Sequence, residues 1–146
     1  MTNPSSVRFD PDVLARIGAF VAAHPGLSLS SASNLLIDEA LRTREHPTVV
    51  FRDGPGGRRA RLIGGPDVWE VIQAVQSARA AEPSLSARRI RALVAESAGL
   101  TVAAADAAIE YWAAYPTEVD SRIDRARAES AQLREHWQRT RRLLDK

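Results

Sequence analysis

The chain of 146 residues contains no cysteine, which excludes disulfide bonds, thiolate metal sites and cysteine nucleophiles. Its three histidines are scattered, so a histidine-rich metal site is not expected either. The chain also lacks any run of about 18 apolar residues, the length that a membrane span requires. The first six residues contain neither the charged region nor the apolar region of a signal peptide, and we therefore expect a cytoplasmic protein.

Lysine and aromatic residues are scarce as well. Lysine occurs once, at position 146, and aromatic residues make up 5% of the chain, so any core must consist mainly of Ala, Leu, Val and Ile. The other 19 basic residues are Arg, and an Ala- and Arg-rich composition often reflects a GC-rich genome rather than a function. Residues 122–146 hold eight basic and four acidic residues. A basic tail of this kind suits an acidic partner or nucleic acid, although exposed helices often carry one too.

The N-terminal third predicts a short strand followed by two helices. Residues 5–9 alternate between polar and apolar side chains, which is typical of a strand. Asp10 is a suitable N-cap and Pro11 a suitable first residue for the first helix. The Ser-rich segment 27–33 offers several N-caps for a second helix over about 31–44.

The rest of the chain predicts a β-hairpin and then helices only. Strands over 49–52 and 58–63 flank a Gly-rich turn, and Asp67, Ser86 and Thr101 are N-caps of the next three helices. A last helix is expected over about 118–144. The fold class is therefore mainly α, with β-α-α followed by β-β-α-α-α-α. We expect three segments: a dimerisation and DNA-binding domain (1–45), a hairpin-plus-three-helix domain (46–117) and a basic C-terminal helix (118–146).

A strand as short as 5–9 cannot bury its apolar face within one chain, so we expect it to pair with the same strand of a second chain. The residues at 7–14 and 35–41 resemble the ribbon-helix-helix family, which includes the Arc, MetJ and CopG-like repressors, over about a third of the chain. The resemblance implies a homodimer whose paired strands enter the major groove of an operator. A tetramer on DNA is also consistent with it.

The resemblance also assigns residues. Ser6 and Arg8 would face the bases, while Pro4, at the preceding outward position, offers no side-chain donor. The start of the second helix would approach a phosphate, with Ser28, Ser30 and Ser31 as candidates. The dimer core would contain Val7, Phe9, Leu14, Ile17, Leu36 and Ile37. The alternative is that the strand and helices only dimerise the protein.

The segment from His46 to about Ile123 resembles a winged-helix antitoxin domain, on residues 57–62, 68–72 and 109–119. In that family the domain is paired with a PIN-like nuclease toxin, which the resemblance implies as a partner. The hairpin would then be a wing whose arginines reach DNA. These arginines are Arg58, Arg59 and Arg61.

Two helices at 86–113, joined by a turn at Gly99, have helix-turn-helix spacing. However, the second of them carries Asp106 and Glu110 and no basic residue, so phosphates would repel it. The competing interpretation is a scaffold that packs against a partner or another copy of the chain.

The C-terminal helix has a thin apolar stripe next to several arginines. Trp and Arg are favoured at the centres of protein interfaces. We expect a partner-binding face that contains Leu133, Trp137, Arg141 and Leu144. The alternatives are that Trp137 packs on the protein's own core, or that the tail frays when isolated.

No phosphate-binding loop of the G-x-x-x-x-G-K-[ST] or G-x-G-x-x-G type occurs, and no carboxylates form an obvious general acid–base pair. We expect no enzymatic activity, no cofactor and no metal. The patterns favour a homodimeric antitoxin and transcriptional repressor of a type II toxin–antitoxin system, which binds its own operator and a toxin. The alternative is an oligomeric interaction scaffold without sequence-specific DNA binding.

Overall fold

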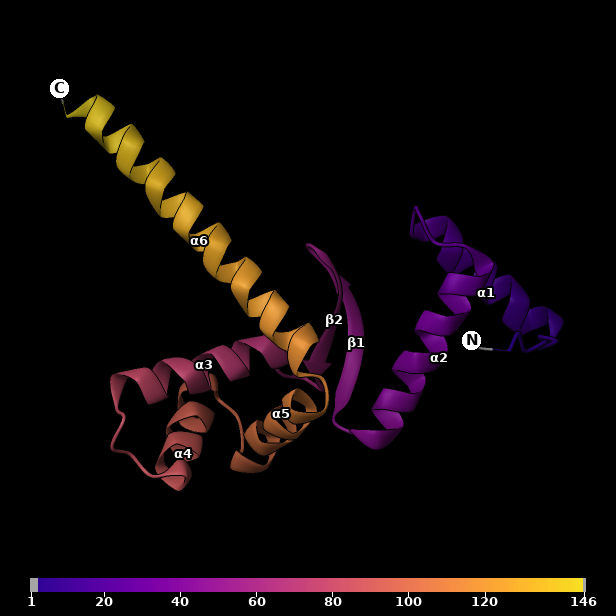
Figure 1. The fold of residues 1–146 in the computed structure, drawn as a ribbon, viewed down its shortest axis with the longest axis horizontal. Helices are drawn as coiled ribbons and strands as arrows, with labels where there is room; N and C mark the ends of the chain where they lie inside the picture. The colour runs from indigo at the N-terminus through magenta and orange to yellow at the C-terminus, as the bar shows by residue number, and fades with distance from the viewer. Residues whose placement is uncertain (1–2, 146) are drawn as a thin grey trace. The chain divides into compact units, whose positions relative to one another are not determined.

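The computed structural model describes residues 3–145 and divides the chain into two compact units, Met1–Glu45 and His46–Lys146. The described residues form six helices and one two-stranded antiparallel sheet, in the order α-α-β-β-α-α-α-α (Figure 1). The predicted mainly α class, the hairpin and the long C-terminal helix are thus confirmed.

The first unit contains helices α1 (Pro11–Ala23) and α2 (Leu29–Glu45). Asp10 has extended backbone angles and Pro11 begins α1, as expected. Helix α2 begins two residues earlier than predicted because Ser28 caps it. The Ser28 N–H donates to Ser31 Oγ at 2.8 Å and the Ser31 N–H donates to Ser28 Oγ at 3.1 Å, a reciprocal capping pair.

The predicted strand at residues 5–9 is wrong for the single chain, because residues 3–10 form neither helix nor strand. The first unit is therefore α-α and not β-α-α in this structure. A strand needs a hydrogen-bonded neighbour, and the one sheet in the described residues is formed by segments of the other unit.

The second unit begins with the hairpin of β1 (Val49–Gly54) and β2 (Gly57–Leu62). Val49 pairs with Leu62 at the open end, and Gly54 pairs with Gly57 at the tip. Pro55 and Gly56 form the two-residue turn. Gly56 has a φ of +83°, so glycine follows proline where a type II turn requires a positive φ.

Four helices follow the hairpin: α3 (Val68–Ala81), α4 (Ala87–Ala98), α5 (Val102–Ala114) and α6 (Pro116–Leu144). Ser86 and Thr101 cap α4 and α5 with their side chains, as predicted. The start of α6 was predicted at about Glu118, but Pro116 occupies its first turn. Helices α4 and α5 meet at 108°. Apart from this bent pair, no helix within residues 3–145 combines the length and the apolar character that a membrane span needs.

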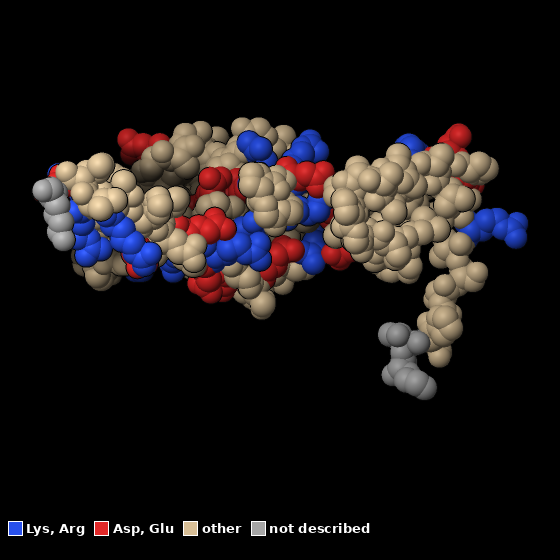
Figure 2. All heavy atoms as spheres, turned by 90° about the horizontal axis from the view of Figure 1, so that it is seen from above, with Lys and Arg blue, Asp and Glu red and all other residues tan. Residues whose placement is uncertain are grey.

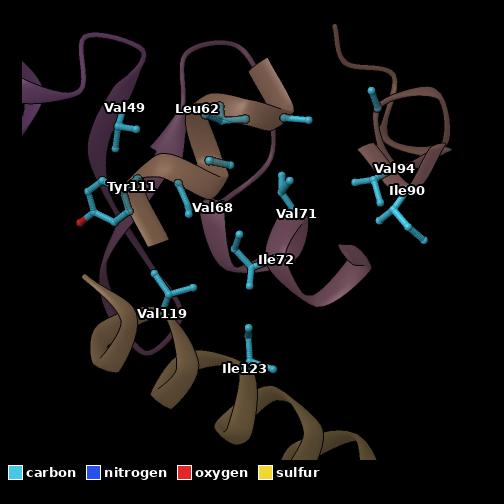
Figure 3. Close-up of a cluster of buried hydrophobic side chains, with 13 residues drawn as sticks. Val49, Leu62, Val68, Val71, Ile72, Ile90, Val94, Tyr111, Val119 and Ile123 are labelled. Atoms are coloured by element: carbon cyan, nitrogen blue, oxygen red, sulfur yellow. The ribbon is translucent and has the colours of Figure 1, made fainter. Parts of the chain in front are cut away.

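One apolar core joins the hairpin to all four helices of the second unit (Figure 3). Helix α6 contributes its first turns to this core, so residues 118–146 begin inside the unit rather than as a separate segment. The core residues are Val49, Leu62, Val68, Val71, Ile72, Ile90, Val94, Ala95, Ala105, Ala108, Tyr111, Val119 and Ile123.

The C-terminal part of α6 leaves this core. Ile123 is buried, whereas every described residue from Arg127 to Asp145 is exposed. Figure 1 shows this part of the helix projecting away from α3, α4 and α5. Most helical stability in proteins comes from tertiary packing, so this part of α6 depends on its anchored first turns and on its own side-chain pairs.

Candidate functional site

A mainly apolar groove lies on the first unit, where the segment before α1 and both helices contribute side chains. It contains four of the six residues predicted for a dimer core: Phe9, Ile17, Leu36 and Ile37. The full lining is Phe9, Val13, Arg16, Ile17, Phe20, Ser33, Leu36, Ile37 and Ala40. The other two predicted core residues, Val7 and Leu14, lie exposed outside it.

The first unit buries very little apolar surface by itself. Among residues 3–45 the buried apolar side chains are Ile17 and Ala32, whereas Val7 is 67% exposed and Ile37 is 50% exposed. The face of this unit seen in Figure 2 is mostly uncharged. A unit of about 45 residues with so small a core needs additional burial to be stable.

The residues predicted to contact DNA bases lie in the segment before α1. Ser6 and Arg8 are both exposed, and they precede Asp10, where α1 is capped. Nothing in residues 3–145 holds the Arg8 guanidinium in an ion pair. Its side chain is therefore available to a ligand.

The three serines predicted near a phosphate lie at the start of α2 and are exposed. Ser28 and Ser31 use their hydroxyl groups for the reciprocal cap, in which Ser28 Oγ and Ser31 Oγ also lie 3.0 Å apart. Ser30 belongs to the first turn, and its carbonyl accepts a hydrogen bond from Asn34. The side chains thus shape the helix end, while the helix N-terminus itself provides the attraction for an anion.

The three wing arginines all have partners within the second unit. Arg58 lies 3.4 Å from a carboxylate oxygen of Asp53 on the paired strand, and Arg61 donates to the Gly65 carbonyl at 2.8 Å. Arg59 Nε lies 3.0 Å from Oδ2 of Asp67, a buried carboxylate that also accepts a hydrogen bond from the Trp69 indole. The Arg59–Asp67 pair links the hairpin to the N-terminus of α3, so the structure favours a structural role for Arg59.

The helix pair α4–α5 is held by a charged contact that sequence reasoning missed. Arg91 donates from Nε and Nη2 to the two carboxylate oxygens of Asp106, both at 2.6 Å. This bidentate hydrogen bonding raises the pKa of Arg91 above its ordinary value. Asp106 thus links α5 to α4. Because the Asp106 carboxylate is paired with Arg91, its negative charge alone is not an argument against phosphate binding by α5.

The predicted partner-binding residues lie on the projecting part of α6. Leu133, Trp137 and Leu144 are all exposed, so Trp137, at 59% exposure, does not pack on the protein's own core. The Arg141 guanidinium lies over the Trp137 ring, 5.2 Å from its centroid. Figure 2 shows basic side chains gathered near the C-terminal end of the chain.

A second group of arginines was not singled out from the sequence. Arg122 and Arg125, one turn apart on α6, reach the tip of the hairpin, with Nη1 of each 3.5 Å from the carbonyl oxygens of Pro55 and Gly56 respectively. Their i, i+3 spacing placed them on one face of the helix. The sequence could not indicate that the hairpin tip faces them, because the contacts span 67 and 69 residues.

Residues 3–145 contain no group of three or more His, Cys, Asp or Glu side chains arranged to hold a metal ion. The features that could bind something are therefore the apolar groove of the first unit, the exposed Arg8, the projecting face of α6 and the arginines at the hairpin tip. Comparison of the chain with known protein families, curated proteins and solved structures finds no match.

Proposed function

We propose that this protein is a homodimeric, ribbon-helix-helix DNA-binding repressor. The observation that carries the proposal is the apolar groove of the first unit, lined by Phe9, Ile17 and Ile37 among others. It faces solvent in a unit that has only two buried apolar side chains within residues 3–45. The occupant that fits is a second copy of the same unit, because that copy brings an equally uncovered groove and an equally unpaired segment 5–9.

Dimerisation satisfies both deficits together. Two segments 5–9 paired antiparallel would satisfy their backbone groups and place Val7 and Phe9 over the joined grooves. The same alternation would place Ser6 and Arg8 of both chains on the opposite face of the ribbon. A two-stranded ribbon of this kind fits the major groove of B-DNA, where Arg makes bidentate contacts with guanine.

The DNA-binding step is tested with the DNA upstream of the gene that encodes this protein. Arg8→Ala is expected to weaken binding by about a hundredfold, because a dimer loses one base contact from each strand. Mobility shift across a salt series, with the dimer monitored by sedimentation, measures the effect.

Arg44→Ala is the matched control, because Arg44 is also an exposed arginine of the first unit but lies in the last turn of α2. It is expected to leave most of the affinity in place. If the unchanged protein is dimeric and shifts no DNA, the interaction scaffold without sequence-specific DNA binding replaces the repressor.

A second function, the binding of an acidic protein partner, is favoured by the projecting part of α6. Leu133, Trp137 and Leu144 follow one another at spacings of four and seven residues and form one apolar stripe. Arg134 and Arg141 lie beside this stripe on the same part of the helix. Such a helix fits an apolar groove with an acidic rim. The antitoxin resemblance implies a PIN-like nuclease as that partner, whose carboxylate-rich metal site would have the complementary charge.

Trp137→Ala is expected to weaken binding of an acidic nuclease encoded beside this protein at least about tenfold, as the loss of an interface hot spot does. Leu143→Ala is the matched control, because Leu143 is also an exposed apolar residue of this part of α6 but lies off the stripe. Titration calorimetry with the purified partner measures both. Binding that survives truncation after Ala131 would overturn this assignment.

A further inference from the structure

Three arginines of the second unit converge on one groove. The groove is formed by the hairpin tip, the side chain of Trp69 on α3 and the early turns of α6. Its basic residues are Arg59, Arg122 and Arg125, and Glu129 is its one acidic lining residue.

The backbone at the hairpin tip allows this close approach. At Gly56 an added Cβ would lie 2.8 Å from Arg122 Nη1, and at Gly54 it would lie 2.3 Å from the Arg59 guanidinium carbon. Both glycines therefore leave room for arginine side chains. The hairpin carbonyls accept only long hydrogen bonds of 3.5 Å from Arg122 and Arg125, which leaves most of their donors unused.

The positive charge of this groove is incompletely balanced. Arg59 is paired with buried Asp67, whereas no carboxylate within residues 3–145 forms an ion pair with Arg122 or Arg125. Burial, followed by the charges of Arg125 and Arg59, lowers the pKa of Arg122 below its ordinary value. Neighbouring arginines that repel one another, one of them partly buried, are stabilised by an anion bound between them.

We propose that this groove binds a phosphate group, held by Arg122 and Arg125 with Arg59 behind them. A phosphate presents oxygens in several directions, so it can accept from two guanidinium groups that approach from successive turns of a helix. A carboxylate offers two oxygens in one plane and a single charge. Glu129 lines the groove and its charge favours the charged form of Arg122, but it forms no ion pair with either arginine, so most of their donors stay open to a ligand.

The phosphate can come from the DNA backbone or from a small free molecule, and the site does not depend on the ribbon. It differs from the predicted wing contact, because Arg58 and Arg61 point to other partners. If DNA is the source, α6 and the hairpin tip would add a sequence-independent contact to the proposed repressor.

The test is a titration of the full chain with inorganic phosphate. Calorimetry measures the affinity, and NMR of the arginine side chains shows which of them respond. Arg122→Gln and Arg125→Gln are each expected to weaken binding about tenfold, the loss of charge-assisted hydrogen bonds. Glu129→Gln is expected to strengthen binding about threefold, because it removes the opposing charge.

Arg127→Gln is the matched control, because Arg127 belongs to the same helix but lies outside this groove and donates to Gln76. If phosphate does not bind, or if Arg127→Gln weakens binding as much as Arg125→Gln, the site is overturned in favour of diffuse charge. Arg125 is exposed, so its variant stays informative if Arg122→Gln fails to fold.

The same variants identify the source of the phosphate. The slope of log affinity for DNA against log salt concentration reports the number of phosphate contacts. If this slope decreases by about one in Arg125→Gln, the DNA backbone is the source of the phosphate. Phosphate binding with unchanged DNA affinity supports the site with a small free molecule as its ligand. Arg8→Ala is expected to bind phosphate normally, which separates failure of this site from failure of the proposed ribbon.

Discussion

Ile37→Glu is expected to convert the protein from a dimer into a folded monomer that no longer binds operator DNA. Ile37 lines the groove of the first unit and is 50% exposed in the single chain, so a monomer tolerates a polar side chain there. In the dimer that side chain would be covered. Each chain would then bury an unpaired carboxylate, and the dimer dissociation constant should rise at least about a thousandfold.

The measurement is sedimentation equilibrium over a range of protein concentrations, with circular dichroism to confirm the helix content. Asn34→Glu is the matched control, because it adds the same charge at an exposed position of α2 outside the groove. We expect this control to remain dimeric. A dimer that persists in Ile37→Glu would contradict the proposed interface and direct attention to the second unit as the site of association.

The elements that sequence reasoning placed correctly are those fixed by local chemistry. Ser86 accepts a hydrogen bond from the Arg89 N–H at 3.2 Å, and Thr101 accepts one from the Ala104 N–H at 3.1 Å. Gly99 ends α4 in the left-handed conformation that the sequence predicts. Each of these signals operates within about four residues, so the chain need not be folded for them to be recognised.

The features that the sequence could not predict depend on residues far apart. The pairing of Arg91 with Asp106 requires the angle between α4 and α5, and the pairing of Arg59 with Asp67 requires the hairpin to lie against α3. Arg59, which sequence reasoning assigned to DNA, therefore helps to hold the fold. The strand at 5–9 failed for a related reason, since its neighbour would have to come from another chain.

The candidate site was predicted unevenly for the same physical reason. The groove residues Phe9, Ile17, Leu36 and Ile37 were among those that the ribbon-helix-helix resemblance assigned to a dimer core. The exposed face of α6 follows from a thin apolar stripe in a basic helix. The meeting of Arg122 and Arg125 with the hairpin tip does not follow, because only the packing of Val119 and Ile123 into the core brings α6 there.

Tyr111→Ala is expected to destabilise the second unit by about 3–5 kcal/mol, the cost of removing a large buried aromatic side chain. Tyr111 is completely buried, and its ring centroid lies 5.3 Å from that of His46 and 4.9 Å from that of Tyr115. Its hydroxyl donates to a carboxylate oxygen of Glu118 at 2.6 Å. The side chain thus joins the start of the unit, α5 and the first turn of α6.

Urea unfolding, monitored by circular dichroism, measures the effect. Two further variants separate the contribution of the hydrogen bond from that of the buried ring. Tyr111→Phe keeps the ring and removes the hydrogen bond to Glu118, so it should cost about 1.5–3 kcal/mol. Trp137→Ala removes a larger but exposed aromatic ring from α6 and should change the free energy of unfolding by less than about 0.5 kcal/mol. Equal losses from Tyr111→Ala and Trp137→Ala would contradict the core described here. A larger loss from Tyr111→Ala than from Trp137→Ala is the expected result, because Tyr111 lies in the core of the unit whereas Trp137 lies on the exposed part of α6.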